Sequence, residues 1–203
     1  MANETEILQW LRQGNESTQR LIDLKWKITK AEGGYLLESE KVPFTLQLGF
    51  LGEEQLMEIK LDTNIETATM ESRDRLGTYR ALLILNSQIK KVKFMLEGLG
   101  ENVVARADID LPTITKDELD NSLSLLLSSL YLMVRVLHLE EEFNQQIVDR
   151  MLMLVKELQA KGKSEKEIVD YLVHDVGFKD EEARKIVSEL AHDDMRGNER
   201  LYG

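Results

Sequence analysis

The stretch TKDELDNSLSLLLSSLYLMVRVLHLEEEF, from Thr115 to Phe143, decides how the rest of the chain is arranged. Thr115 and Glu118 have the S/T-x-x-E spacing of a capping box, in which each side chain satisfies a free backbone N–H at a helix start. The helix predicted to follow is apolar on almost every side from Leu123 to Leu139. Such a helix either spans a membrane or is covered by protein from two directions.

The polar residues of this stretch favour a helix covered by protein. A membrane span needs roughly 18 or more uninterrupted apolar residues, whereas serines, Arg135 and His138 interrupt this run and acidic residues flank it. One side should therefore meet a sheet, and the other a second subunit or the C-terminal segment. A buried guanidinium is costly unless paired, so Arg135 should either find a carboxylate on another element or subunit, or reach the helix edge. The interface predicted on this helix consists of Leu125, Leu132, Arg135, Val136 and Leu139.

The residues before this helix alternate between helical and strand periodicity. A short amphipathic helix is predicted over residues 4–13, and alternating strand-like runs begin near Leu24, Tyr35, Phe44, Met57, Val92 and Val103. Another helix is predicted over 71–88, with an inner face formed by Leu76, Tyr79, Leu83 and Ile84. Gly77 either weakens this helix by roughly 1 kcal/mol relative to alanine or lets another element approach closely.

Pro43 marks either an edge position in one strand or a break between two strands. With a single strand across Pro43, the order of these elements is α-β-β-β-α-β-β-α. Strands joined by short turns predict an antiparallel sheet with helices on one face, so the expected fold class is α+β. Residues 144–203 differ in character, because three short helical patterns follow one another there. Ser164 and Glu167 form a second capping-box pattern within them. We therefore expect two domains: an α+β domain over 1–143 and a small all-α bundle over 144–203 that ends in a polar tail.

Composition limits the classes of function. The chain has 203 residues, a net charge of −11 and no cysteine. An acidic protein lacks the basic field that binds nucleic acid through phosphates, and no basic amphipathic helix for a membrane surface is evident. Without cysteine, disulfides and thiolate metal sites are excluded and a reducing compartment is favoured. Because Met1 to Glu6 also lack the features of a signal peptide, a cytoplasmic location is expected.

The ionisable residues do not form a recognisable catalytic or metal-binding motif. His138, His174 and His192 lack helical ligand spacing and any nucleophile nearby in the sequence. Asp108 and Asp110 stand on one side of a strand, where alternation already requires polar residues. No phosphate-binding or dinucleotide-binding glycine motif is present. The chain is therefore predicted to be no enzyme and to bind neither metal nor cofactor.

The order of elements, the hairpin Val92–Leu111 and the long Leu/Ser-rich helix after Pro112 resemble the type III secretion chaperone-like fold, particularly its YbjN-type members. The resemblance covers about residues 4–143. It implies a small acidic protein that often dimerises and binds other polypeptides without enzymatic activity. In the C-terminal part, Gly177 and Phe178 between two short helices are similar to the Gly-Phe loop of ubiquitin-associated-type bundles, which makes them a second candidate partner loop.

Two functional hypotheses follow from the sequence. The first is a non-enzymatic, chaperone-like interaction protein that forms a homodimer, captures a partner polypeptide, or does both, through apolar surface on its long helix and sheet. The alternative is a small-molecule-binding or regulatory subunit, with a cup between sheet and helices that is lined by Trp26, Tyr35 and Phe94.

Overall fold

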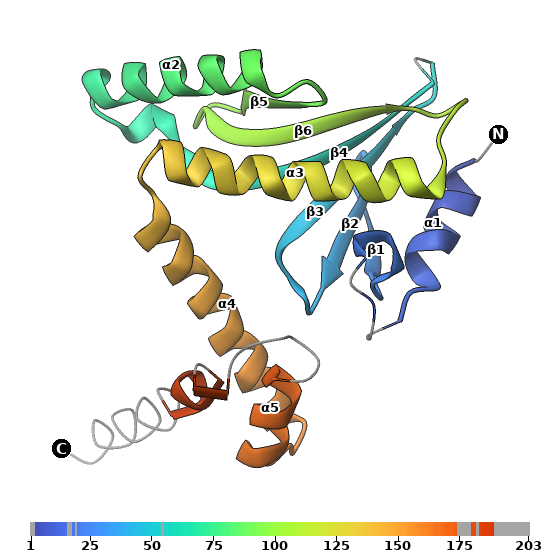
Figure 1. Cartoon of the computed structure of the whole chain (residues 1–203), viewed down its shortest axis with the longest axis vertical. Helices are drawn as coiled ribbons and strands as arrows, with labels where there is room; N and C mark the ends of the chain where they lie inside the picture. Colours follow the sequence, from blue (N-terminus) through green and yellow to red (C-terminus); the bar gives the residue numbers. More distant parts are fainter. Residues whose placement is uncertain are drawn as a thin grey trace. The chain divides into compact units, whose positions relative to one another are not determined.

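The computed structural model describes residues 3–15, 18, 20–53, 55–173, 180–181 and 183–188, with 146 and 148–152 described in their backbone alone. The chain divides into two compact units, Met1–Glu140 and Glu141–Gly203. We call them the first and the second unit and describe each by itself (Figure 1).

The first unit is built on a six-stranded antiparallel sheet with the strand order β1-β2-β3-β4-β6-β5. Every neighbouring pair of strands is antiparallel. The helix α2 (Ser72–Gln88) connects β4 to β5, and β6 returns between these two strands. The strands are β1 (Lys27–Ala31), β2 (Gly34–Ser39), β3 (Val42–Leu51), β4 (Leu56–Glu66), β5 (Val92–Glu97) and β6 (Asn102–Asp110).

The predicted α+β class with an antiparallel sheet is confirmed, with one strand more than the predicted order has. Four strands precede α2, because the chain turns at Glu40 and Lys41 and separates β2 from β3. Pro43 lies in β3 before the part that pairs with β4, beside a register shift against β2. A proline lacks the N–H that a regular ladder needs, and this irregular end of the strand tolerates it.

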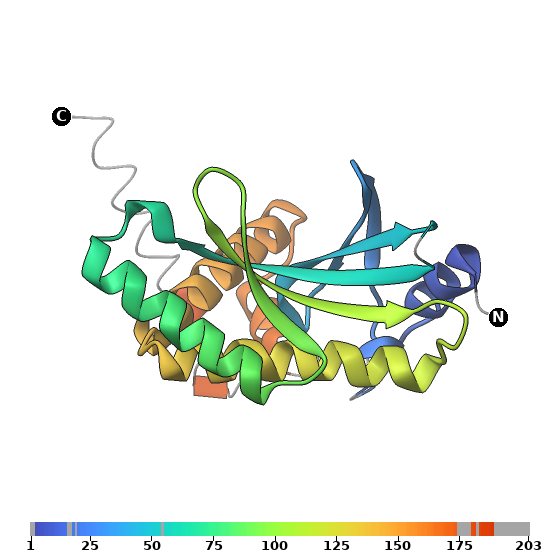
Figure 2. The same cartoon turned by 90° about the horizontal axis from the view of Figure 1, so that it is seen from above.

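One face of the sheet forms the core of the first unit. Alternate residues of the central strands are buried on that face, as the period of two along a strand requires. The helix α3 (Lys116–Val136) lies across this face (Figure 2), and α1 (Glu4–Arg12) contacts β1. Buried strand residues include Leu37, Leu46, Leu48, Met57, Ile59, Leu61, Ala105, Ala107 and Ile109, and buried α3 residues include Leu119, Leu123, Leu126, Leu130 and Met133.

The long helix predicted from Thr115 to Phe143 is in fact two helices. The helix α3 ends at Val136, and α4 (Glu140–Ala160) begins three residues after Leu137, the C-terminal cap of α3. His138 between them has a φ of +56°, which a continuous right-handed helix does not allow. Apolar periodicity continues through this break, so the sequence pattern did not reveal it.

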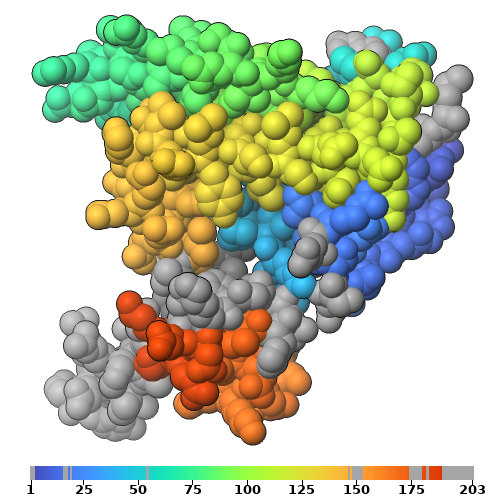
Figure 3. Space-filling model, in the orientation of Figure 1, coloured from blue at the N-terminus to red at the C-terminus, as the bar shows by residue number. Residues whose placement is uncertain are grey.

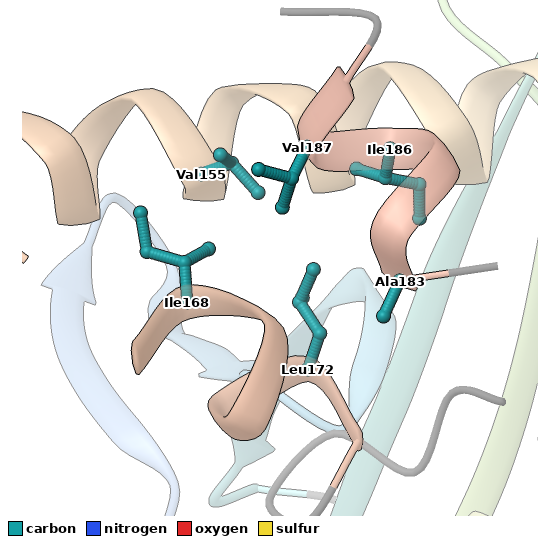
Figure 4. Packing of buried hydrophobic residues seen from close by; sticks show 6 residues of the cluster. All are labelled: Val155, Ile168, Leu172, Ala183, Ile186 and Val187. Atoms are coloured by element: carbon teal, nitrogen blue, oxygen red, sulfur yellow. The ribbon is translucent and has the colours of Figure 1, made fainter. Parts of the chain in front are cut away.

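The second unit contains α4, α5 (Glu165–Tyr171) and further helical residues within 180–188. The capping box predicted at Ser164 and Glu167 is present, with both reciprocal hydrogen bonds. A small apolar core holds these helices together, as Figure 4 shows. The core consists of Val155, Ile168, Leu172, Ala183, Ile186 and Val187.

Candidate protein-interaction surface

The N-terminal end of α3 is fixed to the segment before β1 by polar contacts. The Thr115 side chain accepts a hydrogen bond from the Glu118 N–H and caps the helix. The guanidinium of Arg20 lies 2.6 Å from Asp117 and 3.2 Å from Asp120, and Asp120 also accepts the Ile22 N–H at 3.0 Å. These contacts tie the start of α3 to the segment before β1, while the buried Leu119, Leu123 and Leu126 turn the apolar side of the helix toward the sheet.

The residues predicted as an interface lie toward the C-terminal end of α3 and just beyond it. Leu132 and Val136 are 40% and 42% exposed, Arg135 is exposed, and Leu125 and Leu139 are half-buried. Spacings of seven and eleven residues correspond to about two and three helical turns, which place Leu125, Leu132 and Val136 on one line along the helix. We call these five residues the α3 patch.

The outer face of α3 changes character along its length. Asn121, Ser124 and Ser128 are exposed in its first four turns. Farther on, Tyr131 is 51% exposed and extends the apolar surface beside Leu132. Figure 3 shows this outer side of α3, coloured yellow-green to yellow-orange. The apolar end of α3 thus remains accessible while the opposite side of the helix packs on the sheet.

The end of α3 has the hydrogen bonds of a Schellman motif. The Leu139 N–H donates to the Val134 carbonyl at 2.9 Å, and the His138 N–H donates to the Arg135 carbonyl at 3.3 Å. His138 occupies the left-handed position of this motif, which glycine usually fills. Arg135 lies in the last turn, where a cation interacts favourably with the helix dipole.

The structure contradicts the inner face predicted for α2. Leu76 and Leu83 are each 69% exposed and Ile84 is 48% exposed, whereas Leu82 and Leu85 are buried. At about 100° per residue, these exposed and buried residues form two apolar stripes on roughly opposite sides of the helix. Periodicity alone does not say which stripe faces the rest of the protein. The sequence pattern therefore did not predict the exposed apolar surface formed by Leu76, Leu83 and Ile84.

Side-chain hydrogen bonds hold α2 against the edge of the sheet. The Asn86 amide donates to the Phe94 carbonyl at 3.0 Å and accepts the Phe94 N–H at 2.8 Å. The Tyr79 hydroxyl donates to the carboxylate of Glu101 in the β5–β6 turn, and Thr67 also bonds the Glu101 carbonyl, at 2.9 Å. Because Asn86 imitates a neighbouring strand, it satisfies one residue of the edge strand β5.

Charged residues on the other face of the sheet pair with one another. Arg106 contacts Asp108 at 2.6 Å and Glu58 at 3.2 Å, and Lys60 contacts Glu97 at 3.0 Å. Burial lowers the pKa of Lys60, but its hydrogen bond with Glu97 and the charge of Glu58 outweigh this effect and leave the pKa raised. Asp108 is thus an ion-pair partner of Arg106 on the polar face of the sheet.

The residues predicted to line a ligand cup do not lie together on the sheet. Trp26 and Phe94 are buried core residues. Tyr35 lies on β2 and Phe94 on β5, with three strands between them. The Tyr35 hydroxyl donates to the Glu4 carboxylate at 2.5 Å, and this bond raises the pKa of Tyr35.

The described residues contain neither a metal-binding group nor a membrane-spanning helix. Across the described ranges, no group of three or more His, Cys, Asp or Glu side chains is arranged to hold a metal ion. No helix within the same ranges has the length and hydropathy needed to cross a membrane. His174, His192 and the predicted partner loop of Gly177 and Phe178 lie outside the described residues.

The chain belongs to the family described as Domain of unknown function (DUF8183), whose model matches residues 6–137. A second family model, HTH_78, also described as a domain of unknown function, matches residues 138–203. No curated protein matches the chain.

Several solved structures are similar to parts of the chain. The ExsC–ExsE complex is 20% identical, covers 46% of this chain and 68% of its own, and has a TM-score of 0.38. An uncharacterized protein from Methanothermobacter thermautotrophicus is 13% identical, covers 66% and 96%, and has a TM-score of 0.47. The HopA1–SchA chaperone–effector complex is 13% identical, covers 51% and 77%, and has a TM-score of 0.37.

These similar structures include a chaperone–effector complex, the general class that the sequence resembles. The YbjN type and the ubiquitin-associated-type loop remain predictions. At these identities and TM-scores, what the similar proteins bind is not transferred to this chain.

Proposed function

We propose that this chain is a non-enzymatic, chaperone-like interaction module that binds another polypeptide through the α3 patch. The observation that carries the proposal is the change from exposed serine and asparagine to exposed Tyr131, Leu132 and Val136 along the outer face of α3. Removing the exposed parts of Leu132 and Val136 from water would contribute on the order of 1 kcal/mol each.

The bound polypeptide is a second copy of the chain, a different protein, or each in turn. An isologous homodimer needs a patch that contacts itself across a two-fold axis, and a straight apolar line on one helix meets that requirement. A helix of a different protein would fit the same line by placing its own apolar face along Leu125, Leu132 and Val136. Arg135 beside this line would pair with a carboxylate of the bound chain.

The homodimer is tested by light scattering on the full chain behind a sizing column. The wild type should have twice the monomer mass of 23.4 kDa. The double variant Leu132→Glu with Val136→Glu should have the monomer mass. The matched control, Ser124→Glu with Ser128→Glu, adds the same charge to the exposed polar part of α3 and should behave as the wild type does. A monomeric wild type would reject the homodimer.

Capture of a different protein is tested by purifying tagged wild type and both double variants from the native cells. A partner bound by the wild type and by the serine control should be lost from the Leu132/Val136 variant. The unfolding transition should stay within about 0.5 kcal/mol for both variants, because the mutated side chains are exposed. If the two double variants assemble and capture alike, the α3 patch is not the binding surface.

A further inference from the structure

The helix α2 leaves an apolar stripe uncovered. Its central residues are Leu76, Leu83 and Ile84. Leu83 lies seven residues, or about two turns, after Leu76, and Ile84 is its neighbour, so the three lie along one side of the helix. A shallow hollow of about 500 Å³ runs along the same side. Its lining comes entirely from α2: Leu76, Tyr79, Arg80, Leu83, Ile84 and Ser87. Large exposed apolar side chains gathered in this way mark an interaction site more often than isolated ones do.

The stripe is basic in a chain that is otherwise acidic. The helix α2 contains three arginines and one aspartate, whereas the whole chain has a net charge of −11. At about 100° per residue, Arg73 and Arg80 fall on the side of Leu76 and Leu83, and Asp74 falls on the opposite flank. Both arginines are exposed, and neither has an ion-pair partner within the described part of the chain. The stripe therefore offers two unpaired cations to a bound group.

Gly77 gives an independent indication that another backbone approaches here. It lies in the interior of α2, where glycine is less favourable than alanine. A Cβ atom built at Gly77 would meet nothing within 4 Å, so packing within the chain does not explain the missing side chain. An exposed glycine in the middle of a helix allows close approach of an element from outside the chain.

We propose that the exposed side of α2 binds an amphipathic helix of another protein, with leucine-like residues facing the apolar stripe and acidic residues flanking them. The stripe is straight and about 21 Å long from Arg73 to Ser87, which suits a bound helix with anchors at i, i+3/i+4 and i+7. Acidic flanks would pair with Arg73 and Arg80. A second copy of α2 fits less well, because it would bring arginines against arginines.

The surface is already ordered before binding. Asn86 and Tyr79 fix α2 to β5 and to the β5–β6 turn, and Leu82 and Leu85 pack on its buried side. A preformed helix loses little conformational freedom when it binds. The stripe is separate from the α3 patch, so the two proposals succeed or fail independently.

The test uses fluorescence anisotropy with three labelled peptides of about 18 residues, long enough to hold helical structure. All three carry leucine at i, i+4, i+7 and i+11, and their flanking positions are glutamate, glutamine or lysine. On the wild-type full chain, the glutamate peptide should bind at least about fivefold more tightly than the glutamine peptide, and the lysine peptide more weakly still.

Variants locate the binding on α2. Leu83→Glu should abolish binding of the glutamate peptide, and Arg80→Gln should weaken it up to about fivefold. Arg75→Gln is the matched control, because Arg75 is on the same helix but half-buried on the inner side, and it should leave binding unchanged. Gly77→Ala should raise the folded-to-unfolded ratio about fivefold, which corresponds to about 1 kcal/mol, while weakening peptide binding at least fivefold. These opposite effects distinguish a binding role from a structural one.

Several results would overturn the proposal. It fails if no peptide binds at roughly 1 mM, if affinity does not depend on the charge of the flanks, or if Gly77→Ala binds as the wild type does. If the wild type is a dimer and Leu83→Glu is a monomer, the exposed side of α2 binds a second copy of the chain instead of another protein. If no peptide binds, but the wild type sediments with phosphatidylserine vesicles and Leu83→Glu does not, the exposed side of α2 binds a membrane surface instead.

Discussion

Replacement of Asn86 tests how α2 is held on the sheet. The amide of Asn86 makes two hydrogen bonds with the backbone of Phe94, at 2.8 and 3.0 Å. Each bond contributes about 0.5–1.5 kcal/mol net, and a buried group left unpaired costs about 1–3 kcal/mol. Because Phe94 is buried, Asn86→Ala should destabilise the first unit by about 2–3 kcal/mol. Asn86→Asp should lose a similar amount, since its carboxylate would face the Phe94 carbonyl oxygen.

Tryptophan fluorescence during urea unfolding measures this loss in the first unit specifically. The chain has two tryptophans, Trp10 and Trp26, and both belong to Met1–Glu140. The midpoint should fall with an unchanged slope, and the Phe94 amide should exchange its hydrogen faster. Ser87→Ala is the control, because Ser87 is exposed and bonds within its own helix, to the Ile84 carbonyl. If Asn86→Ala loses less than about 0.5 kcal/mol, the two hydrogen bonds do not hold α2.

Two further predictions concern the helix ends. His138→Gly should stabilise the first unit by roughly 0.5–1 kcal/mol, because glycine adopts the left-handed conformation without strain. Tryptophan fluorescence during urea unfolding would show this gain as a higher midpoint. A lower midpoint would contradict the Schellman assignment. Hydrogen bonds from Ser164 lower the pKa of Glu167 in the folded chain. The ionised Glu167 carboxylate therefore stabilises α5 fully above the usual glutamate pKa of about 4.3, and this stabilisation is lost as the pH falls through the lower pKa of the folded state. The difference in melting temperature between wild type and Glu167→Gln, followed by circular dichroism at 222 nm, should therefore narrow as the pH falls below about 4; a constant difference would count against the capping role.

Local signals in the sequence were reliable where a single element decides its own structure. Both capping-box patterns depend on side chains three residues apart. The one at Ser164 forms in full, whereas at Thr115 only the bond from the Glu118 N–H to the Thr115 side chain forms. The Glu118 carboxylate instead lies 3.6 Å from the Lys91 ammonium. The strands alternate as predicted, because one face of an antiparallel sheet must be buried whatever covers it. The short amphipathic helix predicted over residues 4–13 also forms, as α1, with Ile7, Leu8 and Leu11 on its buried side.

The candidate surfaces depended on information that periodicity does not carry. The sequence predicted an apolar outer side for the long helix, and Leu132 and Val136 are exposed there. It did not predict where that helix ends, because apolar residues continue through the turn at His138. A helix break of this kind is decided by backbone hydrogen bonds at the cap, which leave no change in hydrophobic pattern.

The sequence by itself determined the α+β class, the antiparallel strands and the starts of the capped helices, since these follow from neighbours within a few residues of one another. Only the tertiary structure decided which side of α2 faces outward. Leu76 and Leu83 are as apolar as Leu82 and Leu85, and the choice between the two stripes comes from the Asn86 and Tyr79 contacts with residues on β5 and in the β5–β6 turn. Such contacts join residues from separate elements, and the chain must fold before they exist.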